Sequence, residues 1–302
     1  MHRSSEITRK KSLIFSMTKK SKQSKEDSSS NFYIKPDYED ALKQKGLTSI
    51  EDIFTFESGK NLTKENLASY RSRIKFEAGS PAITFYLKRY DKPPLLLQLK
   101  NWLAHRKKAS FAYFDFEPAE SLRNAGINTP QTIAFGDEWG ILFETRSFCI
   151  VKEIAGADAI ERKLPDCFYQ ARTAGNFQLR RDFIRRLAQF IRKFHQTGYR
   201  HRDLYFSHIF YNNNEFYLID LARAFVPQLL SERFRVKDIA QLFYSAPKRF
   251  FSYTDRMRFY LEYNGRVRLN KEDKLFIRNV VRKARRMARH DTKYGRSAPF
   301  AG

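Results

Sequence analysis

Residues 201–224 read His-Arg-Asp-Leu-Tyr-Phe-Ser-His-Ile-Phe-Tyr-Asn-Asn-Asn-Glu-Phe-Tyr-Leu-Ile-Asp-Leu-Ala-Arg-Ala. The polar run 212–214 separates two apolar runs, and this pattern predicts a β-hairpin. Asp203 precedes the first run on a loop, and Asp220 ends the second run. The hairpin therefore holds two carboxylates, about 17 residues apart in the chain, at a fixed distance.

This layout is typical of a phosphoryl-transfer site of the kinase type. One carboxylate, here Asp203, orients the attacking hydroxyl, and the second, here Asp220, holds Mg²⁺ against the phosphates of ATP. His208 stands where protein kinases carry Asn. A neutral imidazole there can ligate a second metal ion or orient Asp203, and a purely structural hydrogen bond is the alternative. His195, beside an apolar helical stripe, is expected to be a packed core residue.

Lys88 ends the apolar run 85–88, about 115 residues before Asp203. A kinase site needs one lysine at such a strand end to reach the α- and β-phosphates of ATP. A carboxylate from a nearby helix should hold this lysine, and Asp115 and Glu117 are the candidates. Residues two apart in a helix face nearly opposite sides, so only one of them can do so, and either can instead cap the helix.

Two further features of the first half concern phosphate binding and the helix that carries the acidic candidates. No Gly-x-Gly-x-x-Gly motif precedes the lysine, but Gly59-Lys60 followed by Lys64 can form a cationic phosphate cover, with an ordinary loop as the equal alternative. Pro118 suits the first turn of a helix that ends near Gly126.

Hydrophobic periodicity divides the chain into a strand-rich first half and a helix-rich second half. Strands are predicted at 74–78, 83–87, 133–135, 140–143 and 147–151, and helices at about 95–106, 179–194, 236–247 and 271–289. This order predicts an α+β, two-lobed, protein-kinase-like fold, with a β-rich N-lobe and a mainly helical C-lobe. We expect a disordered basic tail over 1–30, a nucleotide-binding N-lobe over 31–155, and a catalytic and substrate-binding C-lobe over 156–302.

The charge of the chain points to a polyanionic partner. Its 302 residues contain 57 Lys and Arg against 33 Asp and Glu, a net charge of +24. Nucleic acid, anionic lipid headgroups or an anionic glycan can supply the opposite charge, and a generally basic solvated surface is the alternative. No zinc finger, aromatic–basic platform or basic coiled-coil region is visible, so no specific nucleic acid partner is expected.

The spacing of the cysteines and the length of the apolar runs indicate the cellular compartment of the protein. Cys149 and Cys167 lack the spacing of a zinc site or redox pair, and we expect reduced thiols. No apolar run reaches the length of about 18 residues that a transmembrane helix needs. The run 13–15 is too short for a secretory signal, so we expect the protein to stay on the side of the membrane where it is made.

With these motifs in order, the chain resembles the Kdo/WaaP lipopolysaccharide kinase family of Gram-negative bacteria, relatives of the protein-kinase fold. The resemblance covers roughly residues 55–290. It rests on Tyr86–Lys88, Gly126–Pro130, Phe194-His195 before Gly198, His201–Tyr205 with His208, Leu218–Leu221 with Arg223-Ala224, and Val236–Ala240.

The resemblance implies transfer of phosphate from ATP to a sugar hydroxyl of the lipopolysaccharide inner core, on Kdo or heptose, at the cytoplasmic face of the inner membrane. By this match Lys88 grips ATP, Asp203 acts as base, and His208 and Asp220 bind Mg²⁺. The family's helix carboxylate falls in register with Asp115. The same match makes Asp238 a buried structural anchor under the catalytic loop.

An anionic glycolipid substrate at the inner-membrane surface also accounts for the charge, and implies a cytoplasmic, peripheral protein. The basic block of the last predicted helix can face this substrate or the membrane, or form a solvated face: Arg282, Lys283, Arg285, Arg286 and Arg289. A protein or small-molecule kinase with the same site is the second enzyme reading, and the absence of an Ala-Pro-Glu signature after Asp220 argues against a protein kinase. A catalytically silent scaffold on acidic lipid or nucleic acid is the rival from another class.

Overall fold

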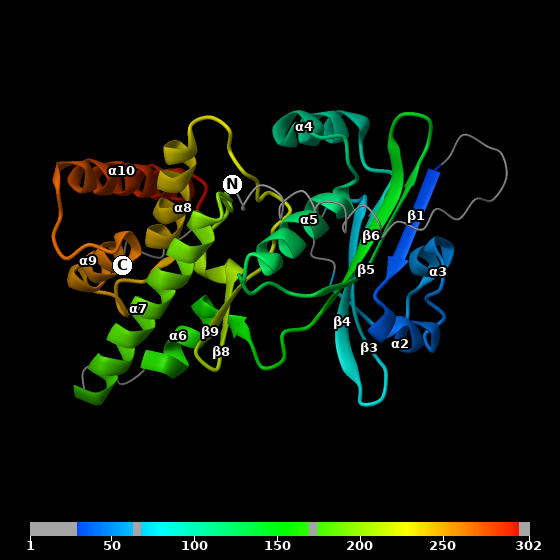
Figure 1. The fold of residues 1–302 in the computed structure, drawn as a ribbon, viewed down its shortest axis with the longest axis horizontal. Coiled ribbons are helices and arrows are strands. Elements are labelled where there is room, and N and C mark those ends of the chain that lie inside the picture. Colours follow the sequence, from blue (N-terminus) through cyan, green and yellow to red (C-terminus); the bar gives the residue numbers. More distant parts are fainter. Residues whose placement is uncertain (1–28, 63–67, 169–173, 296–302) are drawn as a thin grey trace, which may run out of the picture. The chain divides into compact units, whose positions relative to one another are not determined.

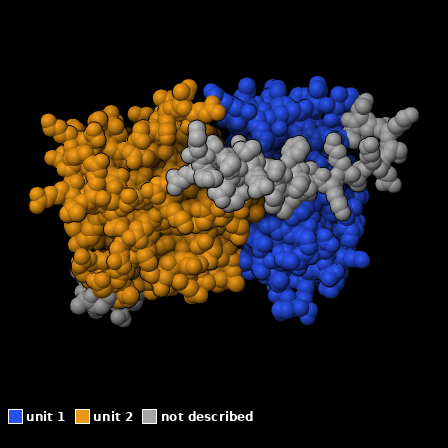
Figure 2. Space-filling model, viewed as in Figure 1, with its two compact units in different colours: residues 1–117, 131–153 blue, residues 118–130, 154–302 orange. Residues whose placement is uncertain are grey.

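The computed structural model describes residues 29–62, 68–168 and 174–295 (Figure 1). The chain forms two compact units, coloured separately in Figure 2. Unit 1 comprises residues 1–117 and 131–153, and unit 2 comprises residues 118–130 and 154–302. Of the tail predicted to be disordered, residues 1–28 lie outside the described residues, whereas Ser29 and Ser30 belong to a strand.

Unit 1 is built on a six-stranded antiparallel sheet with the order β1-β5-β6-β4-β3-β2. Its strands are β1 (Ser29–Ile34), β2 (Lys60–Asn61), β3 (Arg71–Ala78), β4 (Ile83–Asp91), β5 (Thr132–Trp139) and β6 (Glu144–Lys152). The β3–β4 hairpin confirms the strands predicted at 74–78 and 83–87, because alternating apolar residues bury one face of each strand.

The two faces of this sheet carry different residues. Phe85 and Leu87 of β4 join the core, which η1 (Pro36–Tyr38), α2 (Glu39–Lys43) and α3 (Ile50–Thr55) complete with buried residues such as Leu42. Lys88 and Tyr90 alternate with those positions and point to the opposite face. There Tyr90 packs in a smaller cluster with a residue of α5 (Phe111–Asn124).

The strand predicted at 140–143 is wrong. These residues form the turn between β5 and β6, closed by a hydrogen bond from the Gly140 amide to the Phe143 carbonyl at 2.9 Å. Ile141 and Leu142 are 81% and 61% exposed, so their apolar character does not mark a buried strand. The strand predicted at 147–151 lies within β6.

The predicted start of the helix near Pro118 is also wrong. α5 begins at Phe111, where the Ser110 hydroxyl accepts a hydrogen bond from the Tyr113 amide at 3.2 Å and caps the helix. Pro118 therefore lies inside α5, where the helix forgoes one backbone hydrogen bond. The acidic candidates of the sequence lie within the helix rather than ahead of it.

Unit 2 is mainly helical and includes a small antiparallel sheet of order β7-β8-β9. Its elements are β7 (Asp158–Ala159), α6 (Ile160–Phe168), α7 (Ala174–Gln196), η2 (Phe206–His208), β8 (Ile209–Asn212), β9 (Glu215–Leu218), α8 (Ser231–Ser245), α9 (Tyr253–Asn264) and α10 (Lys271–Lys293). The predicted hairpin is present as β8 and β9, and Asn213 and Asn214 turn it at φ of 46° and 67°, a conformation that Asn tolerates.

The amphipathic stripe predicted for 179–194 forms most of the inner face of α7. Phe183, Leu187 and Phe194 are buried in the core of unit 2. Leu179 is 60% exposed, which contradicts its predicted place on the stripe, because the first turns of α7 extend past the buried cluster. In the described ranges no helix combines the length and apolarity needed to cross a membrane, and both cysteines are free thiols.

Candidate active site

One buried carboxylate, that of Asp238, fixes the start of the loop 201–208 of unit 2 by hydrogen bonds to its backbone. Asp238 of α8 is fully buried and accepts hydrogen bonds from the backbone amides of His201 and Arg202, both at 2.8 Å. His195 approaches the same carboxylate at 3.3 Å and its other ring nitrogen lies 2.7 Å from the Tyr263 hydroxyl. Burial opposes the charge of Asp238, but the hydrogen bonds to His195 and the loop together hold its pKa below the usual value. Asp238 is thus the buried anchor that the resemblance implies.

His201 connects the two segments that carry the candidate carboxylates. Its Nε2 donates to the Ile219 carbonyl at 3.0 Å, and its Nδ1 accepts from the Asp203 amide at 3.3 Å. Burial lowers the pKa of His201, and the neutral imidazole is the form that can both donate and accept in this way. One ring therefore fixes the backbone of Asp203 relative to the residue that precedes Asp220.

His208 lies between the two aspartates. Its Nδ1 donates to the backbone carbonyl of Asp203 at 2.7 Å, so in the neutral ring Nε2 carries a lone pair. That Nε2 lies 3.8 Å from Oδ2 of Asp220. Asp220 itself adopts a left-handed backbone with φ of 57°, an uncommon conformation that is concentrated at functional sites. The structure thus brings Asp203, His208 and Asp220 together.

Two cations hold the carboxylate of Asp203. Arg223 donates to Oδ2 at 2.8 Å, and the ammonium of Lys237 lies 3.9 Å from Oδ1. Lys237 also donates to the carbonyl of Arg202, while Gln241 donates to the same carbonyl at 2.8 Å. The side chain that the sequence assigns as the base is therefore oriented by fixed partners and surrounded by positive charge.

In unit 1, Lys88 and Asp115 form the ion pair expected from the sequence. The Lys88 ammonium lies 3.1 Å from Oδ2 of Asp115, and the side chains are 18% and 5% exposed. The Tyr90 hydroxyl donates to the same oxygen at 2.6 Å, and burial raises its pKa well above the usual value, so it stays a donor. Asp115 thus satisfies two donors from one strand.

The remaining sequence candidates lie elsewhere in unit 1. Glu117 lies two residues after Asp115 on α5, whereas the ion pair described above joins Lys88 to Asp115. Lys60 lies exposed in β2, opposite Lys75 in register, and Lys64 of the predicted phosphate cover lies outside the described residues. Gly59 is required beside it, because a Cβ there would approach the Lys75 carbonyl oxygen to 2.6 Å.

The donor set around Asp220 fits a magnesium ion that also binds a nucleotide. Mg²⁺ is held in such sites by one or two carboxylates, with phosphates and water completing the shell. Asp220 supplies the carboxylate, and His208 presents a ring nitrogen beside it. Across the described ranges no cluster of three or more His, Cys, Asp or Glu side chains that could hold a metal ion is present.

Sequence reasoning assigned no role to Tyr90, Arg223 or Lys237. Tyr90 had a signal, because it lies two residues after Lys88 on the same strand and so faces the same side. Arg223 and Lys237 reach Asp203 from later segments through extended side chains, and no spacing rule predicts which lysine or arginine turns inward.

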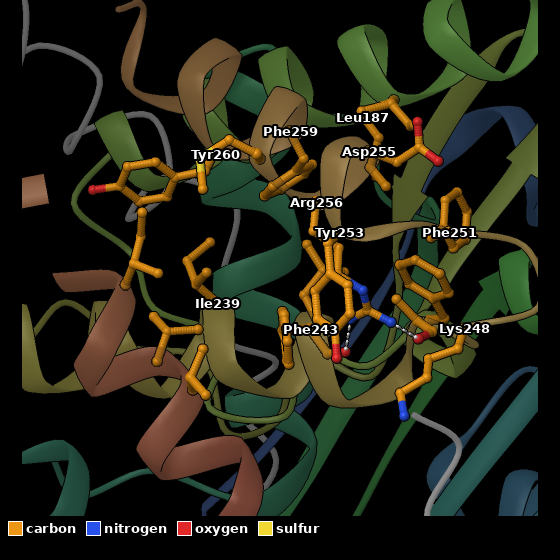
Figure 3. A pocket seen from close by; sticks show the side chains of 18 of the residues that line it. Leu187, Ile239, Phe243, Lys248, Phe251, Tyr253, Asp255, Arg256, Phe259 and Tyr260 are labelled. Atoms are coloured by element: carbon orange, nitrogen blue, oxygen red, sulfur yellow. Dashed lines mark hydrogen bonds between the residues drawn. The ribbon is translucent and has the colours of Figure 1, made fainter. Parts of the chain in front are cut away.

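Unit 2 contains two further hollows. An apolar pocket of about 400 Å³ lies among α7, α8, α9 and α10 (Figure 3). Arg256 borders it, and its guanidinium donates to the carbonyls of Phe243 and Ala246 at 2.9 and 2.6 Å. An open groove of about 900 Å³, here called the α8–α10 groove, lies along α8 and α10. It is lined by six cations and two carboxylates: Arg233, Arg235, Lys237, Arg282, Lys283, Arg286, Glu232 and Glu272.

The chain is similar to known proteins in sequence and in fold. The lipopolysaccharide core heptose(I) kinase WaaP of Escherichia coli is 27% identical over 201 residues, covering 63% of this chain and 74% of that protein. The WaaP of Pseudomonas aeruginosa is 24% identical over 206 residues, covering 65% and 76%. A solved structure of WaaP in complex with acyl carrier protein matches with a TM-score of 0.61 at 19% identity, covering 85% of this chain and 98% of that one.

The structural match establishes the fold as two-lobed, kinase-like and α+β, as the order of predicted elements indicated. The pattern of the family described as Lipopolysaccharide kinase (Kdo/WaaP) matches residues 99–263, more than half of the chain. This range includes Asp115, the loop 201–208, Asp220 and the anchor Asp238. The chain belongs to the lipopolysaccharide kinase (Kdo/WaaP) family.

Proposed function

We propose that this protein transfers the γ-phosphate of ATP to a hydroxyl of a heptose in the lipopolysaccharide inner core, with Kdo as the alternative acceptor. The observation that carries the proposal is the fixed set of Asp203, His208 and Asp220 in a member of this kinase family. Relatives named as heptose(I) kinases favour heptose over Kdo. The substrate is membrane-bound, so the enzyme works as a peripheral protein at the cytoplasmic face.

In this mechanism each side chain has one task. Asp203 accepts the proton of the attacking sugar hydroxyl, while Arg223 and Lys237 hold its carboxylate and add positive charge near the transferred group. The ammonium of Lys88, positioned by Asp115, contacts the phosphates of ATP. Asp220 and His208 would hold Mg²⁺, which would supply positive charge against these phosphates.

The test measures phosphate transfer from ATP to purified core glycolipid by mass spectrometry, as the gain of one phosphate. We expect Asp203→Asn and Asp220→Asn to lower the rate by at least about a thousandfold while both variants keep the wild-type melting temperature. Asp182→Asn, which changes only the contacts of Asp182 with Arg185 and Gln178 on the surface of α7, is the matched control and should keep full activity. Full transfer by either site variant overturns the assignment.

The α8–α10 groove supports an anionic glycolipid as the substrate. Its lining has a surplus of four positive charges, and in the described parts of the chain Arg282, Lys283 and Arg286 form no ion pair. Lys237 connects the groove to the site, because it lines the groove and also approaches Asp203. We therefore assign the groove to phosphates or carboxylates of the glycolipid, whose sugar then reaches Asp203. Of the predicted basic block, Arg285 borders the apolar pocket instead.

Replacement of Arg282, Lys283 and Arg286 by Gln tests this role. We expect KM for the glycolipid to rise by about tenfold or more, with KM for ATP unchanged, because only the acceptor loses its counter-charges. The matched control replaces Lys271, Lys274 and Arg278, which lie on the same helix outside the groove lining. An equal effect of the two triple variants contradicts the assignment of the groove.

Acyl carrier protein is the second proposed partner. The structurally similar WaaP is in complex with acyl carrier protein, and the apolar pocket of unit 2 offers a place for an acyl chain. The test compares binding of acylated and unacylated carrier protein to the wild type and to Ala246→Phe, which fills the pocket. Equal affinity of both carrier forms for the wild type contradicts the role of the pocket.

A further inference from the structure

Helix α4 (Leu95–His105) is packed against unit 1 by its polar side, which reverses the usual arrangement. Gln98 is buried, and its amide donates to the carbonyls of Pro93 and Glu144 at 2.9 and 3.0 Å. The Glu144 amide in turn donates to the side-chain oxygen of Gln98 at 2.9 Å. Trp102 adds a stacked contact with Phe143 and a hydrogen bond from its indole to the Ala109 carbonyl at 2.8 Å.

The leucines of α4 are consequently left to solvent. Leu96 and Leu103 are 80% and 79% exposed, and the other three leucines of the helix are also exposed. Leu95, Leu99 and Leu103 recur every four residues, so they form one stripe along the helix. Such a stripe normally faces a protein core, and here no part of unit 1 described by the structure covers it.

The turn between β5 and β6 extends this surface. Its residues Ile141 and Leu142 are exposed, and the neighbouring Phe143 stacks on Trp102 of α4 at 5.4 Å. In the described part of unit 1, every exposed large aliphatic side chain belongs either to α4 or to this turn. We call the five leucines of α4 together with Ile141 and Leu142 the leucine patch. Its members are concentrated on two adjoining segments rather than scattered.

The stretch of chain that carries α4 is also positively charged. From residue 92 to residue 114 the sequence contains no carboxylate, and its five Lys and Arg residues are all exposed. These are Lys92, Lys100, Arg106, Lys107 and Lys108. Exposed leucines edged by cations match an anionic bilayer surface, into which the leucines insert while the cations meet the headgroups. A groove of another protein would pair with the leucines but would not explain five exposed cations on the same stretch of chain.

We propose that the leucine patch is the membrane-docking element of this protein, with α4 lying in the interface of an anionic bilayer. The proposal deepens and rests on the proposed function, because a kinase of a lipid-anchored sugar has to work at the membrane surface. α4 anchors the enzyme by insertion, and the five exposed lysines and arginines of residues 92–108 select anionic headgroups. The patch thus acts separately from the residues that carry the phosphoryl transfer.

The test uses the full chain and vesicles of phosphatidylethanolamine with phosphatidylglycerol, without ATP or lipopolysaccharide. We expect Leu96→Gln/Leu103→Gln to lower vesicle affinity by about tenfold or more, because two inserted side chains lose their apolar contact with the bilayer. The control Leu229→Gln/Val267→Gln removes side chains in unit 2 that are 71% and 91% exposed and should change affinity by less than about twofold. Since all four positions are exposed, circular dichroism should show unchanged folding.

A second readout comes from the wild type. The chain has 2 tryptophans, Trp102 and Trp139, and they stack at 6.1 Å beside the patch. Quenching of their fluorescence by brominated lipids therefore reports insertion of this region alone. Equal vesicle binding of wild type and Leu96→Gln/Leu103→Gln, or no quenching on binding, overturns the proposal. So does a wild-type dimer that this variant converts to a monomer, because the occupant is then a second copy. Because no substrate is present, each of these results leaves the kinase proposal intact.

Discussion

Replacing Asp238 by Asn is expected to destabilise unit 2 without touching any proposed substrate contact. The carboxylate is fully buried and accepts three hydrogen bonds: from the amides of His201 and Arg202 and from His195. Oδ1 accepts one of these and Oδ2 accepts the other two. An Asn amide can keep its oxygen at the Oδ2 position, but its NH₂ group then faces the donating amide of Arg202.

The magnitude follows from this geometry. Loss of one charge-assisted hydrogen bond costs about 2 kcal/mol, and the two that remain become neutral and weaken by about 1 kcal/mol each. The sum is about 4 kcal/mol of unfolding free energy. For a unit of this size each kcal/mol corresponds to about 2–4 °C, so the melting temperature should fall by about 8–16 °C.

The assay combines thermal unfolding by circular dichroism with hydrogen exchange of individual amides. The amides of residues 201 and 202 should exchange faster in Asp238→Asn than in the wild type, since they lose the charged acceptor. Asp182→Asn serves as control and should shift the midpoint by less than about 2 °C. A midpoint change below about 2 °C in Asp238→Asn, with unchanged protection of both amides, would refute the anchoring role.

Three further outcomes are expected. Lys88→Met should weaken ATP binding by about tenfold to a hundredfold in calorimetry, because a charged contact to phosphate is lost. The control Lys43→Met on α2 should leave the affinity for ATP unchanged. Equal affinities of the two variants contradict the role of Lys88. Burial raises the pKa of Glu144 to about 7, so the folded state loses stability as pH rises from about 4.5 to 7. In urea unfolding, the free energy of unfolding of Glu144→Gln should therefore rise by about 3 kcal/mol relative to the wild type between pH 4.5 and pH 8. Burial lowers the pKa of His195 and His201, so unit 2 should lose stability as pH falls below 6.5, by about 1.4 kcal/mol per pH unit for each histidine. Protection factors of the amides of unit 2 that are unchanged between pH 7 and 5.5 contradict this.

The sequence predicts elements best where one periodicity dominates. Alternation identified β3 and β4, and the repeat of Phe183 and Leu187 identified α7. The apolar residues of the turn 140–143 were misread because a short apolar run looks the same whether it is buried or exposed. The helix predicted at about 95–106 is present as α4, but the pattern did not reveal that its leucines face solvent and that its buried residue is a single Gln. α9 went unpredicted because mixed polar and aromatic residues give its sequence only a weak pattern.

The site residues also differ in how far the sequence predicts their contacts. Asp203, His208 and Asp220 lie on the segments that immediately flank one local hairpin, so their spacing in the chain fixes their separation. The pairing of Lys88 with Asp115 depends on how α5 packs on the sheet, which spacing alone left open between two carboxylates. The cations around Asp203 arrive from later segments, and their orientation is a property of the folded side chains.

The shared oxygen of Asp115 has an evolutionary consequence. It receives the Lys88 ammonium at 3.1 Å and the Tyr90 hydroxyl at 2.6 Å, so a short carboxylate and a long phenol together span the gap between helix and strand. Glu at position 115 would push its extra methylene into the space that the phenol occupies. Relatives with Glu there should therefore carry a smaller residue at position 90, and the two positions should exchange as a pair across the family.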